Sequence, residues 1–322
     1  MSTATVQFVL DGEVVSINAP PPTRTVLQYL REDCRRTGTK EGCAEGDCGA
    51  CTVVVAELNG DATGLTFKAV NACIRFLPTL HGKALYTVES ISNPTPHPVQ
   101  QALVEHHASQ CGFCTPGFVM SLFAQYQQQQ PLSRAAVDIA LAGNLCRCTG
   151  YRPIVDAALR MHDYPQPDDD LSQRTIAALK KIDATELTFE SASASYHAPT
   201  DLSSLLRLAT AHPQAYLLAG GTDIGLWVTK QHRELTHLIS LAEVSELHEV
   251  NNDETGLRIG AMVDMQRAMM AITAAYPELQ ALFIRFASTP IHTAATLGGN
   301  IANGSPIGDS MPPLIALGAR VT

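Results

Sequence analysis

The sequence is poor in charge, and above all in positive charge. Only 16% of its 322 residues are charged, and 22 Lys and Arg residues face 31 Asp and Glu residues, which gives a net charge of −9. Soluble domains usually carry about 25% charged residues. The acidic balance gives no electrostatic support for binding nucleic acid or an anionic membrane surface. The scarcity of charge indicates instead that much of the surface is buried against partner proteins.

Long apolar runs are missing as well. No stretch approaches the roughly 18 consecutive apolar residues of a membrane-spanning helix. Residues 1–20 have neither a cationic segment nor a cleavage site of small residues. We therefore expect a cytoplasmic protein without a membrane anchor. In a reducing cytoplasm, the nine cysteines are expected to be metal ligands or free thiols rather than disulfides.

The pattern of apolar residues changes along the chain, which is too long for a single hydrophobic core. We predict an α+β protein of several domains. Residues 1–88 have the pattern of a small α+β unit, and residues 89–163 have helical spacing. Residues 164–187 are polar and contain proline, as expected of a linker. Residues 188–322 alternate between helical and strand patterns.

Turn residues, caps and prolines predict the individual elements. Asp11-Gly12 is a hairpin signal, Thr25 is a suitable helix cap, and prolines open three later helices at the first turn, where proline is tolerated. The predicted strands are 6–10, 13–17, 52–58, 216–219, 238–241 and 257–259, with a further apolar stretch at 69–74. The predicted helices are 25–35, 98–107, 116–129, 134–142, 153–161, 175–181, 202–209 and 226–231.

Three cysteines crowd the glycine-rich segment GCAEGDCGAC (42–51), and a fourth lies further along the chain. Cys43, Cys48, Cys51 and Cys73 have the C-x4-C-x2-C…C spacing of a plant-type [2Fe–2S] cluster. The glycines permit the backbone to wrap around an inorganic core and to point N–H groups at the sulfurs. Zinc sites more often have paired knuckles on both sides. An iron–sulfur cluster is therefore favoured over zinc, and over a set of small buried residues.

A second cysteine set has the form C-x2-C…C-x-C, with Cys111, Cys114, Cys146 and Cys148. A predicted helix follows each pair, so four thiolates lie between two helix N-termini, which favour an anionic group. This spacing alone also suits zinc. The plant-type set in the same chain makes a second [2Fe–2S] cluster the better interpretation. Cys34 remains unpaired and is expected to be an inert core thiol.

Two glycine-rich stretches mark the C-terminal half, LLAGGTDIGLW (217–227) and ATLGGNIANGSPIGDS (295–310). The first lies between a predicted strand and a predicted helix, where backbone N–H groups can hold a phosphate. Helix capping and ordinary turn chemistry explain both stretches equally well. No G-x-G-x-x-G motif is present, so a Rossmann dinucleotide site is not supported.

Long motifs around the cysteines resemble the two-cluster module of the xanthine dehydrogenase and molybdenum hydroxylase family. They are GTKEGCAEGDCGACT (38–52), QCGFCTPGF (110–118) and GNLCRCTGYRPI (143–154). The resemblance implies a β-grasp ferredoxin-like domain followed by a helical-bundle domain, each with one [2Fe–2S] cluster. It also implies that the plant-type cluster lies nearer a flavin and the helical-domain cluster nearer a molybdopterin on a partner. Gln110 and Cys148 match positions that approach the pterin.

The two glycine-rich stretches are similar to the flavin motifs of the same family, whose FAD domain has the vanillyl-alcohol-oxidase-type fold. Phe286 matches a residue placed against the isoalloxazine ring. The resemblance implies that the pyrophosphate and adenosine contact Leu217, Leu218, Ala219, Gly220, Gly221, Thr222, Asp223 and Ile224. It implies that the phosphates and ribityl chain contact Thr296, Gly299, Asn300, Ser305 and Asp309. The family's flavin domain continues further, so we expect the domain at 188–322 to be truncated.

The resemblance implies the small iron–sulfur and FAD subunit of a xanthine dehydrogenase. Such a subunit relays electrons from a molybdopterin-binding large subunit through both clusters to FAD and NAD+, during hypoxanthine and xanthine oxidation. A heterotetramer of two small and two large chains is expected, with no catalytic acid or base on this chain. The alternatives are a related aldehyde or N-heterocycle hydroxylase, a ferredoxin-like carrier without a molybdenum partner, and a zinc scaffold.

Overall fold

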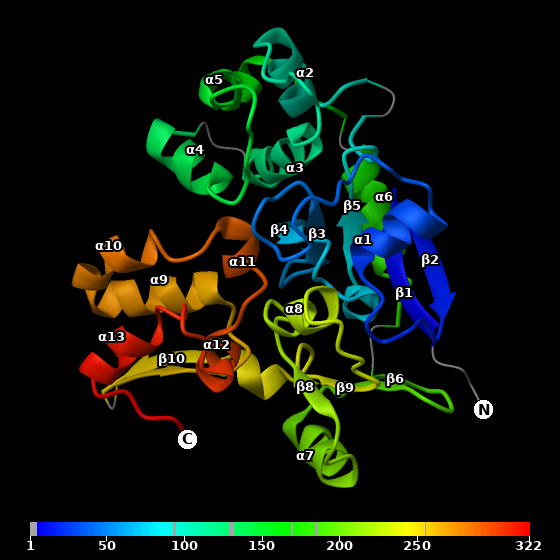
Figure 1. Ribbon diagram of the computed structural model, residues 1–322, viewed down its shortest axis with the longest axis vertical. Helices are drawn as coiled ribbons and strands as arrows, with labels where there is room; N and C mark the ends of the chain where they lie inside the picture. The colour runs from blue at the N-terminus through cyan, green and yellow to red at the C-terminus, as the bar shows by residue number, and fades with distance from the viewer. Residues whose placement is uncertain (1–4, 93–94, 129–131, 169, 184–185, 255) are drawn as a thin grey trace.

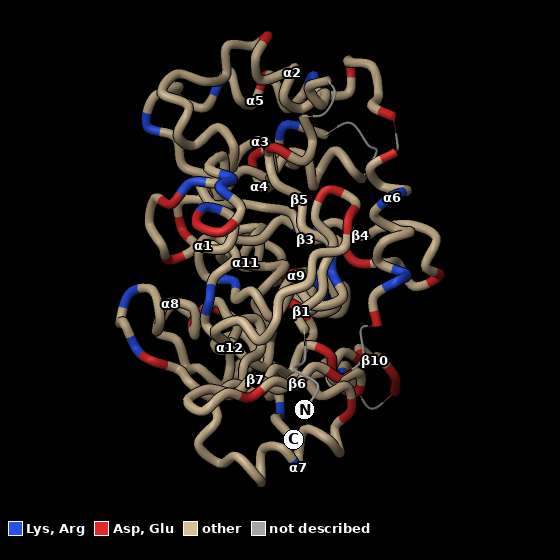
Figure 2. Tube along the Cα trace, turned by 90° about the vertical axis from the view of Figure 1, so that its right-hand side faces the viewer, with Lys and Arg blue, Asp and Glu red and all other residues tan. Residues whose placement is uncertain are grey.

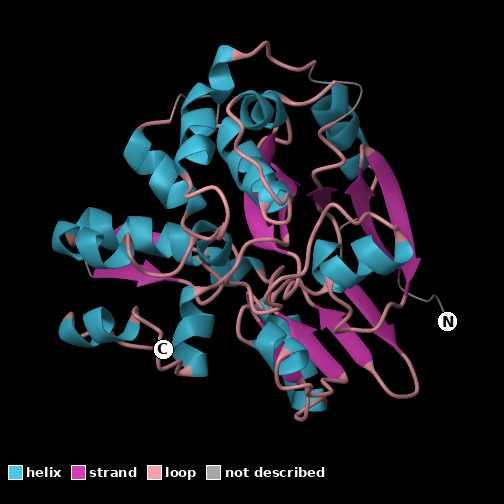
Figure 3. Ribbon diagram, turned by 45° about the horizontal axis from the view of Figure 1, so that its top comes forward, coloured by secondary structure: helices cyan, strands magenta, loops and turns pink. Residues whose placement is uncertain are grey.

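The structure is a computed structural model that describes residues 5–92, 95–128, 132–168, 170–183, 186–254 and 256–322. The predicted α+β multidomain class is confirmed: the described residues form a five-stranded sheet, a four-stranded sheet and a two-stranded hairpin, with helices on several sides. Figures 1 and 3 show helices α2–α5 gathered on one side of the first sheet, with the second sheet near its opposite end. Among the described residues, Lys and Arg are interleaved with Asp and Glu (Figure 2).

The first sheet has the strand order β2-β1-β5-β3-β4, in which β1 and β5 are parallel and the other pairs antiparallel. The predicted hairpin is confirmed, with Asp11 and Gly12 both at positive φ, as a tight two-residue turn requires. Thr25 caps the helix α1 through a reciprocal bond with Gln28, and a π-helical turn continues it. The elements are β1 (Thr5–Leu10), β2 (Glu13–Asn18), α1 (Val26–Gln28), the π turn (Tyr29–Asp33), β3 (Thr52–Leu58), β4 (Leu65–Asn71) and β5 (Ala84–Tyr86).

The second region is a bundle of four helices, as predicted. Helix α3 is buried around most of its circumference, which explains its almost wholly apolar sequence, and it packs against β3 and β4. Prolines lie in the first turns of α2, α3 and α5. The helices are α2 (Pro98–Glu105), α3 (Thr115–Tyr126), α4 (Arg134–Leu141) and α5 (Arg152–Arg160). The predicted end of the second of these helices, at Gln129, lies outside the described residues.

The predicted linker contains a helix, α6 (Asp170–Leu179), that packs against β1 and β2. The Arg174 guanidinium donates to the Asp11 carbonyl at 3.1 Å, and the Tyr86 hydroxyl donates to the Thr175 hydroxyl at 2.9 Å. The sequence indicated a shorter helix, at 175–181. These contacts with the first sheet come from residues distant in sequence, so local pattern could not reveal them.

The C-terminal region contains a four-stranded sheet of order β6-β7-β9-β8 and a separate β10–β11 hairpin. The strands predicted at 216–219, 238–241 and 257–259 are confirmed within a residue or two. The strands are β6 (Leu187–Glu190), β7 (Ser195–Ala198), β8 (Tyr216–Leu218), β9 (His237–Ser240), β10 (Val250–Asp253) and β11 (Gly256–Ile259). The helices are α7 (Leu202–Ala211), α8 (Ile224–Thr229), α9 (Met265–Ala275), α10 (Gln280–Phe283), α11 (Thr289–His292), α12 (Leu297–Asn303) and α13 (Met311–Ala316).

Hydrophobic cores join the three regions. One core combines the bundle helices with β3, β4, β5 and α6, and a second combines the first sheet with β6, β7, β8 and β9. The described residues also form short 3-10 helices at Leu77–Leu80, Met161–Asp163, Ser245–His248 and Pro277–Leu279. None of the described helices has the length and apolar character needed to cross a membrane.

Candidate functional site

The first cysteine set lies on the loop before β3 and in the segment after β4. Residues Ala44, Gly46 and Gly49 have positive φ, so the loop wraps as the glycines indicated. The backbone N–H groups of Glu45 and Cys48 both donate to the Cys43 Sγ atom at 3.4 Å. Such N–H groups stabilise negative charge on the sulfur.

The four sulfurs of this set meet through Cys73. Its Sγ atom lies 3.2 Å from that of Cys51, and both residues are buried. A hydrogen bond from Cys73 lowers the pKa of Cys43 to about 3, and another lowers the pKa of Cys51. The same two contacts raise the pKa of Cys73. Burial raises the pKa of Cys48, which also contacts Cys43. The contacts therefore favour the thiolate form, which binds iron, at Cys43 and Cys51.

The second cysteine set also forms pairs. Burial, followed by contact with Cys146, raises the pKa of Cys114 to about 12, and contact with Cys111 raises that of Cys148. Each pair joins one cysteine before α3 to one before α5, so the four thiols lie between the two helix N-termini. The Tyr151 hydroxyl accepts a hydrogen bond from the Cys146 backbone N–H at 2.9 Å and so fixes this loop. Cys111 and Cys148 are exposed, whereas Cys146 is buried.

This pairing distinguishes a two-iron cluster from a single zinc ion. Among the described residues, no three cysteine sulfurs lie within 4.8 Å of one another. A tetrahedral zinc site needs four mutually close sulfurs, whereas each iron of a [2Fe–2S] cluster takes its own two thiolates. The arrangement of both sets therefore fits [2Fe–2S] clusters better than zinc.

The two cysteine loops touch each other directly. The Leu145 N–H donates to the Cys48 carbonyl at 3.0 Å, and the buried Asn144 amide donates to the Gly49 carbonyl at 3.2 Å. A Cβ atom on Gly49 would lie 2.1 Å from the Gly143 carbonyl oxygen, and one on Gly117 would lie 2.1 Å from that of Gly49. Only glycine permits this approach. We call it the inter-loop contact.

The first glycine-rich stretch lies against the plant-type cysteine loop. Gly225 packs so closely on Ile74, the residue after Cys73, that an added Cβ atom would lie 2.7 Å from it. The Thr229 hydroxyl of α8 donates to the Ala44 carbonyl at 2.7 Å. The flavin motif and the plant-type loop are therefore neighbours, and the bundle loops lie on the other side of the plant-type loop.

A cavity of about 500 Å³ opens between the first sheet and the C-terminal region. Leu218, Ala219, Gly220, Gly221 and Thr296 of the predicted flavin residues line it, and Thr222 lines a smaller cavity beside it. Gly220 is essential to its shape, because an added Cβ atom would lie 1.9 Å from the Ala294 carbonyl oxygen.

Cationic side chains from distant segments also line the cavity. Lys83 is paired with Glu57 and Glu243 at 2.8 and 3.1 Å, and Lys68 is 3.4 Å from Asp264. The buried Nε atom of Arg75, in contrast, has no hydrogen-bond partner among the described residues. An unpaired guanidinium N–H beside a glycine-rich loop suits a pyrophosphate group, so the cavity fits the phosphate part of FAD. Sequence reasoning missed Arg75, although it lies only two residues after Cys73.

The remaining predicted flavin residues lie around α12 or outside the larger cavity. Thr296 caps α12 by accepting from the Gly299 N–H at 3.0 Å, and Asn300 accepts from the Ser310 hydroxyl at 2.5 Å. Phe286 is buried in the core formed with α9 and α12 and stacks on His292. The following are not among the residues that line either cavity: Leu217, Asp223, Ile224, Phe286, Gly299, Asn300, Ser305 and Asp309. Their flavin contacts stay predictions.

Comparisons with known proteins divide the chain in the same order. Residues 8–76 match a 2Fe-2S iron-sulfur cluster binding domain, and residues 87–159 match a [2Fe-2S] binding domain. Residues 188–322 match the FAD binding domain in molybdopterin dehydrogenase.

Similar proteins include xanthine dehydrogenase of Drosophila subobscura, which is 36% identical over 99% of this chain and 28% of its own length. Xanthine dehydrogenase/oxidase of Rattus norvegicus is 31% identical over 98% of this chain and 27% of its own length. Quinoline 2-oxidoreductase from Pseudomonas putida 86 is a solved structure with 28% identity and a TM-score of 0.41, over 56% of this chain and 98% of that chain. The chain thus spans less than a third of the length of these curated relatives.

The chain belongs to the molybdenum hydroxylase family and carries the family's two [2Fe–2S] domains and its FAD-binding domain. More particularly, it is the iron–sulfur and FAD part of a xanthine dehydrogenase-like member, homologous to an oxidoreductase. The predictions of family, of two clusters and of FAD are confirmed.

Proposed function

We propose that this chain is the electron-transfer subunit of a cytoplasmic xanthine dehydrogenase. A separate partner chain holds molybdopterin and hydroxylates hypoxanthine and xanthine. Electrons enter this chain at the bundle cysteines, continue to the plant-type cysteines and the flavin site, and leave on NAD+. When bound, the clusters supply one-electron transfer and FAD exchanges one or two electrons.

One observation carries this proposal, namely that the three cofactor sites are joined by direct protein contacts. The backbone N–H next to Cys146 donates to the carbonyl of Cys48, at 3.0 Å. On the other side of the plant-type loop, the residue after Cys73 packs against the glycine-rich flavin loop. The cysteines bind iron, the wrapped loop stabilises the thiolates, and the inter-loop contact keeps the two loops at a constant separation.

The exposed end of the relay suits a partner chain. Cys111 and Cys148 are exposed, as is Gln110, which the sequence placed near the partner's pterin. Large apolar side chains beside them are also exposed, with Phe113 at 47% and Leu145 at 51%. Exposed apolar groups of this kind mark protein interfaces. The partner is a molybdopterin-binding large subunit in an assembly of two small and two large chains.

The proposal is tested by purifying the untagged chain from its native cells and identifying what co-purifies. We expect a molybdopterin-binding chain, iron and acid-labile sulfide for two clusters, FAD, and xanthine-dependent reduction of NAD+. Activity on aldehydes or N-heterocycles but not on purines would favour a related hydroxylase. A chain that purifies with no molybdenum partner would contradict the proposal.

Two substitutions test the relay itself. Cys48→Ser and Cys146→Ser should each abolish a different [2Fe–2S] signal in the electron paramagnetic resonance spectrum. Both should stop NAD+ reduction while the partner still hydroxylates xanthine with an artificial electron acceptor. Loss of one common signal by both variants would contradict two separate sites.

A further inference from the structure

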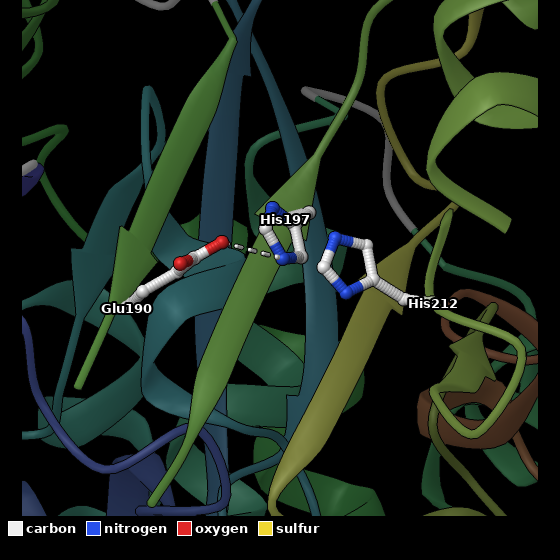
Figure 4. Close-up of side chains that lie close together, drawn as sticks. All are labelled: Glu190, His197 and His212. Carbon is white, nitrogen blue, oxygen red and sulfur yellow. Dashed lines mark ion pairs between the residues drawn. The ribbon is translucent and has the colours of Figure 1, made fainter. Parts of the chain in front are cut away.

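A group of metal-ligating side chains lies on the second sheet, outside the cysteine sets. Glu190 is the last residue of β6, His197 lies in β7, and His212 follows the last turn of α7 (Figure 4). The antiparallel register pairs Thr188 with His197, so Glu190 lies on the same face of the sheet as His197, one step along the diagonal. Helix α7 packs on this face, beside Ile239 of β9, and its C-terminal end brings His212 to the group.

The geometry of the group is close to that of a metal site. One ligand atom from each residue lies within 4.8 Å of the other two. The His197 Nε2 atom lies 3.6 Å from the Glu190 carboxylate, and the His197 and His212 rings stack at 28° with centroids 4.9 Å apart. Zinc–nitrogen and zinc–oxygen bonds of about 2.0–2.2 Å place tetrahedral ligand atoms about 3.3 Å apart. Closing the site therefore takes shifts of up to about 1.5 Å and a rotation of the His212 ring out of its stack on His197, and the exposed Glu190 side chain can follow.

The burial of His197 is the second, independent observation. Its side chain is only 2% exposed, and within the described residues neither ring nitrogen has a hydrogen-bond partner. Leaving a buried polar group unpaired costs about 1–3 kcal/mol. Buried polar groups are almost always paired, so two orphaned nitrogens on one imidazole call for a ligand.

The charged form of His197 is disfavoured at this position. Burial, and then the neighbouring His212, lowers the pKa of His197, with His237 acting in the same direction. The carboxylates Glu190 and Glu186 oppose this effect without reversing it. Neutral imidazole is the form that binds metals.

We propose that Glu190, His197 and His212 bind one Zn²⁺ ion, with water in the fourth position. Two imidazoles and one carboxylate are ligands that zinc accepts readily, and thiolate-free sets of this kind do not favour iron–sulfur chemistry. The ion joins β6, β7 and the end of α7. It therefore acts as a structural metal ion that stabilises the C-terminal region, and it takes no part in electron transfer.

The test uses the full chain with its clusters loaded, purified without a histidine tag. Equilibrium dialysis against Zn²⁺, followed by metal analysis, gives the zinc bound per chain and its affinity. Acid-labile sulfide is measured in the same samples, because unchanged sulfide shows that zinc has not displaced iron from the cysteines. The variants are Glu190→Gln and His212→Asn, and the matched control is His232→Asn, an exposed histidine at φ 55° that asparagine replaces without strain.

We expect one zinc per chain in the wild type and in His232→Asn, and a rise in the thermal unfolding midpoint on adding zinc. Glu190→Gln and His212→Asn should bind zinc at least about tenfold more weakly. Removing a group that only hydrogen-bonds to a metal ligand already weakens metal binding about tenfold or more, so removing a ligand should cost no less. Their midpoints should respond correspondingly less to zinc. Absence of zinc binding in the wild type would overturn the proposal, as would equal binding by His212→Asn and the wild type.

Discussion

We predict that the hydrogen bonds of Asn144 stabilise the inter-loop contact. Asn144 is 2% exposed, donates to the Gly49 carbonyl and the Thr52 hydroxyl, and accepts from the Ser121 hydroxyl at 2.7 Å. Substitution Asn144→Ala removes all three hydrogen bonds. Each contributes about 1 kcal/mol net. The Gly49 carbonyl stays paired, because it still accepts from the N–H and hydroxyl of Thr52. We therefore count only the other two bonds and expect the free energy of unfolding to fall by about 2 kcal/mol.

This loss converts to a measurable change in thermal stability. Unfolding entropy of about 2.1 cal/mol/K per residue, over the whole chain, gives a fall of about 3 °C in the unfolding midpoint. Asn144→Asp should lose at least as much, because its carboxylate faces the Gly49 carbonyl with no proton to donate. Iron and sulfide content should stay unchanged, since Asn144 binds neither cluster. The control is Asn252→Ala, which removes an exposed asparagine.

Calorimetry of the cluster-loaded chain measures the midpoints of all three variants and the wild type. The reasoning is refuted if Asn144→Ala unfolds at the same temperature as Asn252→Ala. It is also refuted if Asn144→Asp is milder than Asn144→Ala, because the amide donor would then be unimportant.

Three further predictions concern the bundle and the flavin cavity. Burial, and then His162, lowers the pKa of His97 to about 4. The unfolded chain takes up a proton on this histidine near pH 6.5, so the free energy of unfolding should fall by about 3 kcal/mol between pH 6.5 and 4. Calorimetry at a series of pH values should show a shallower fall for His97→Asn, whose side-chain oxygen can still cap the helix. Gly220→Ala should lose flavin absorbance while keeping its full iron content, because the added Cβ atom collides with the Ala294 carbonyl. The control Gly60→Ala, which has open space around it, should keep its flavin. Equal flavin content in the two variants would reject the site. Arg75→Gln should weaken FAD binding about tenfold relative to the wild type, as expected for loss of one charged hydrogen bond; unchanged affinity in a fluorescence titration would remove Arg75 from the site.

Sequence reasoning succeeded where the chemistry depends on residues close together in the chain. The spacing of Cys43, Cys48 and Cys51 fixes a loop that can hold a cluster, and Thr25 places a helix start correctly because capping is a local interaction. The prolines of the bundle mark its helices for the same reason.

It failed where the site depends on register or on distant segments. Arg75 faces Gly220 across the cavity, and nothing in the local sequence joins the two. Glu190 and His197 share a face only because of the β6–β7 register, and His212 joins them only because α7 ends there.

The unequal burial of the two cysteine sets has a consequence for the order of biogenesis. Cys51 and Cys73 are 1% and 3% exposed, and Gly225 and Thr229 of the C-terminal region pack on the neighbouring Ile74 and Ala44. The other two cysteines of this set, Cys43 and Cys48, are half-buried, whereas Cys111 and Cys148 of the second set are exposed. A scaffold protein that delivers a preassembled cluster needs direct access to the receiving thiols. We expect the plant-type site to be filled before the C-terminal region closes over it, and the bundle site to accept its cluster later. Reconstitution of the folded apoprotein should then restore the bundle signal first, and equal rates for both signals would contradict this order. On this expectation, the last site to be filled is the one whose thiols are exposed.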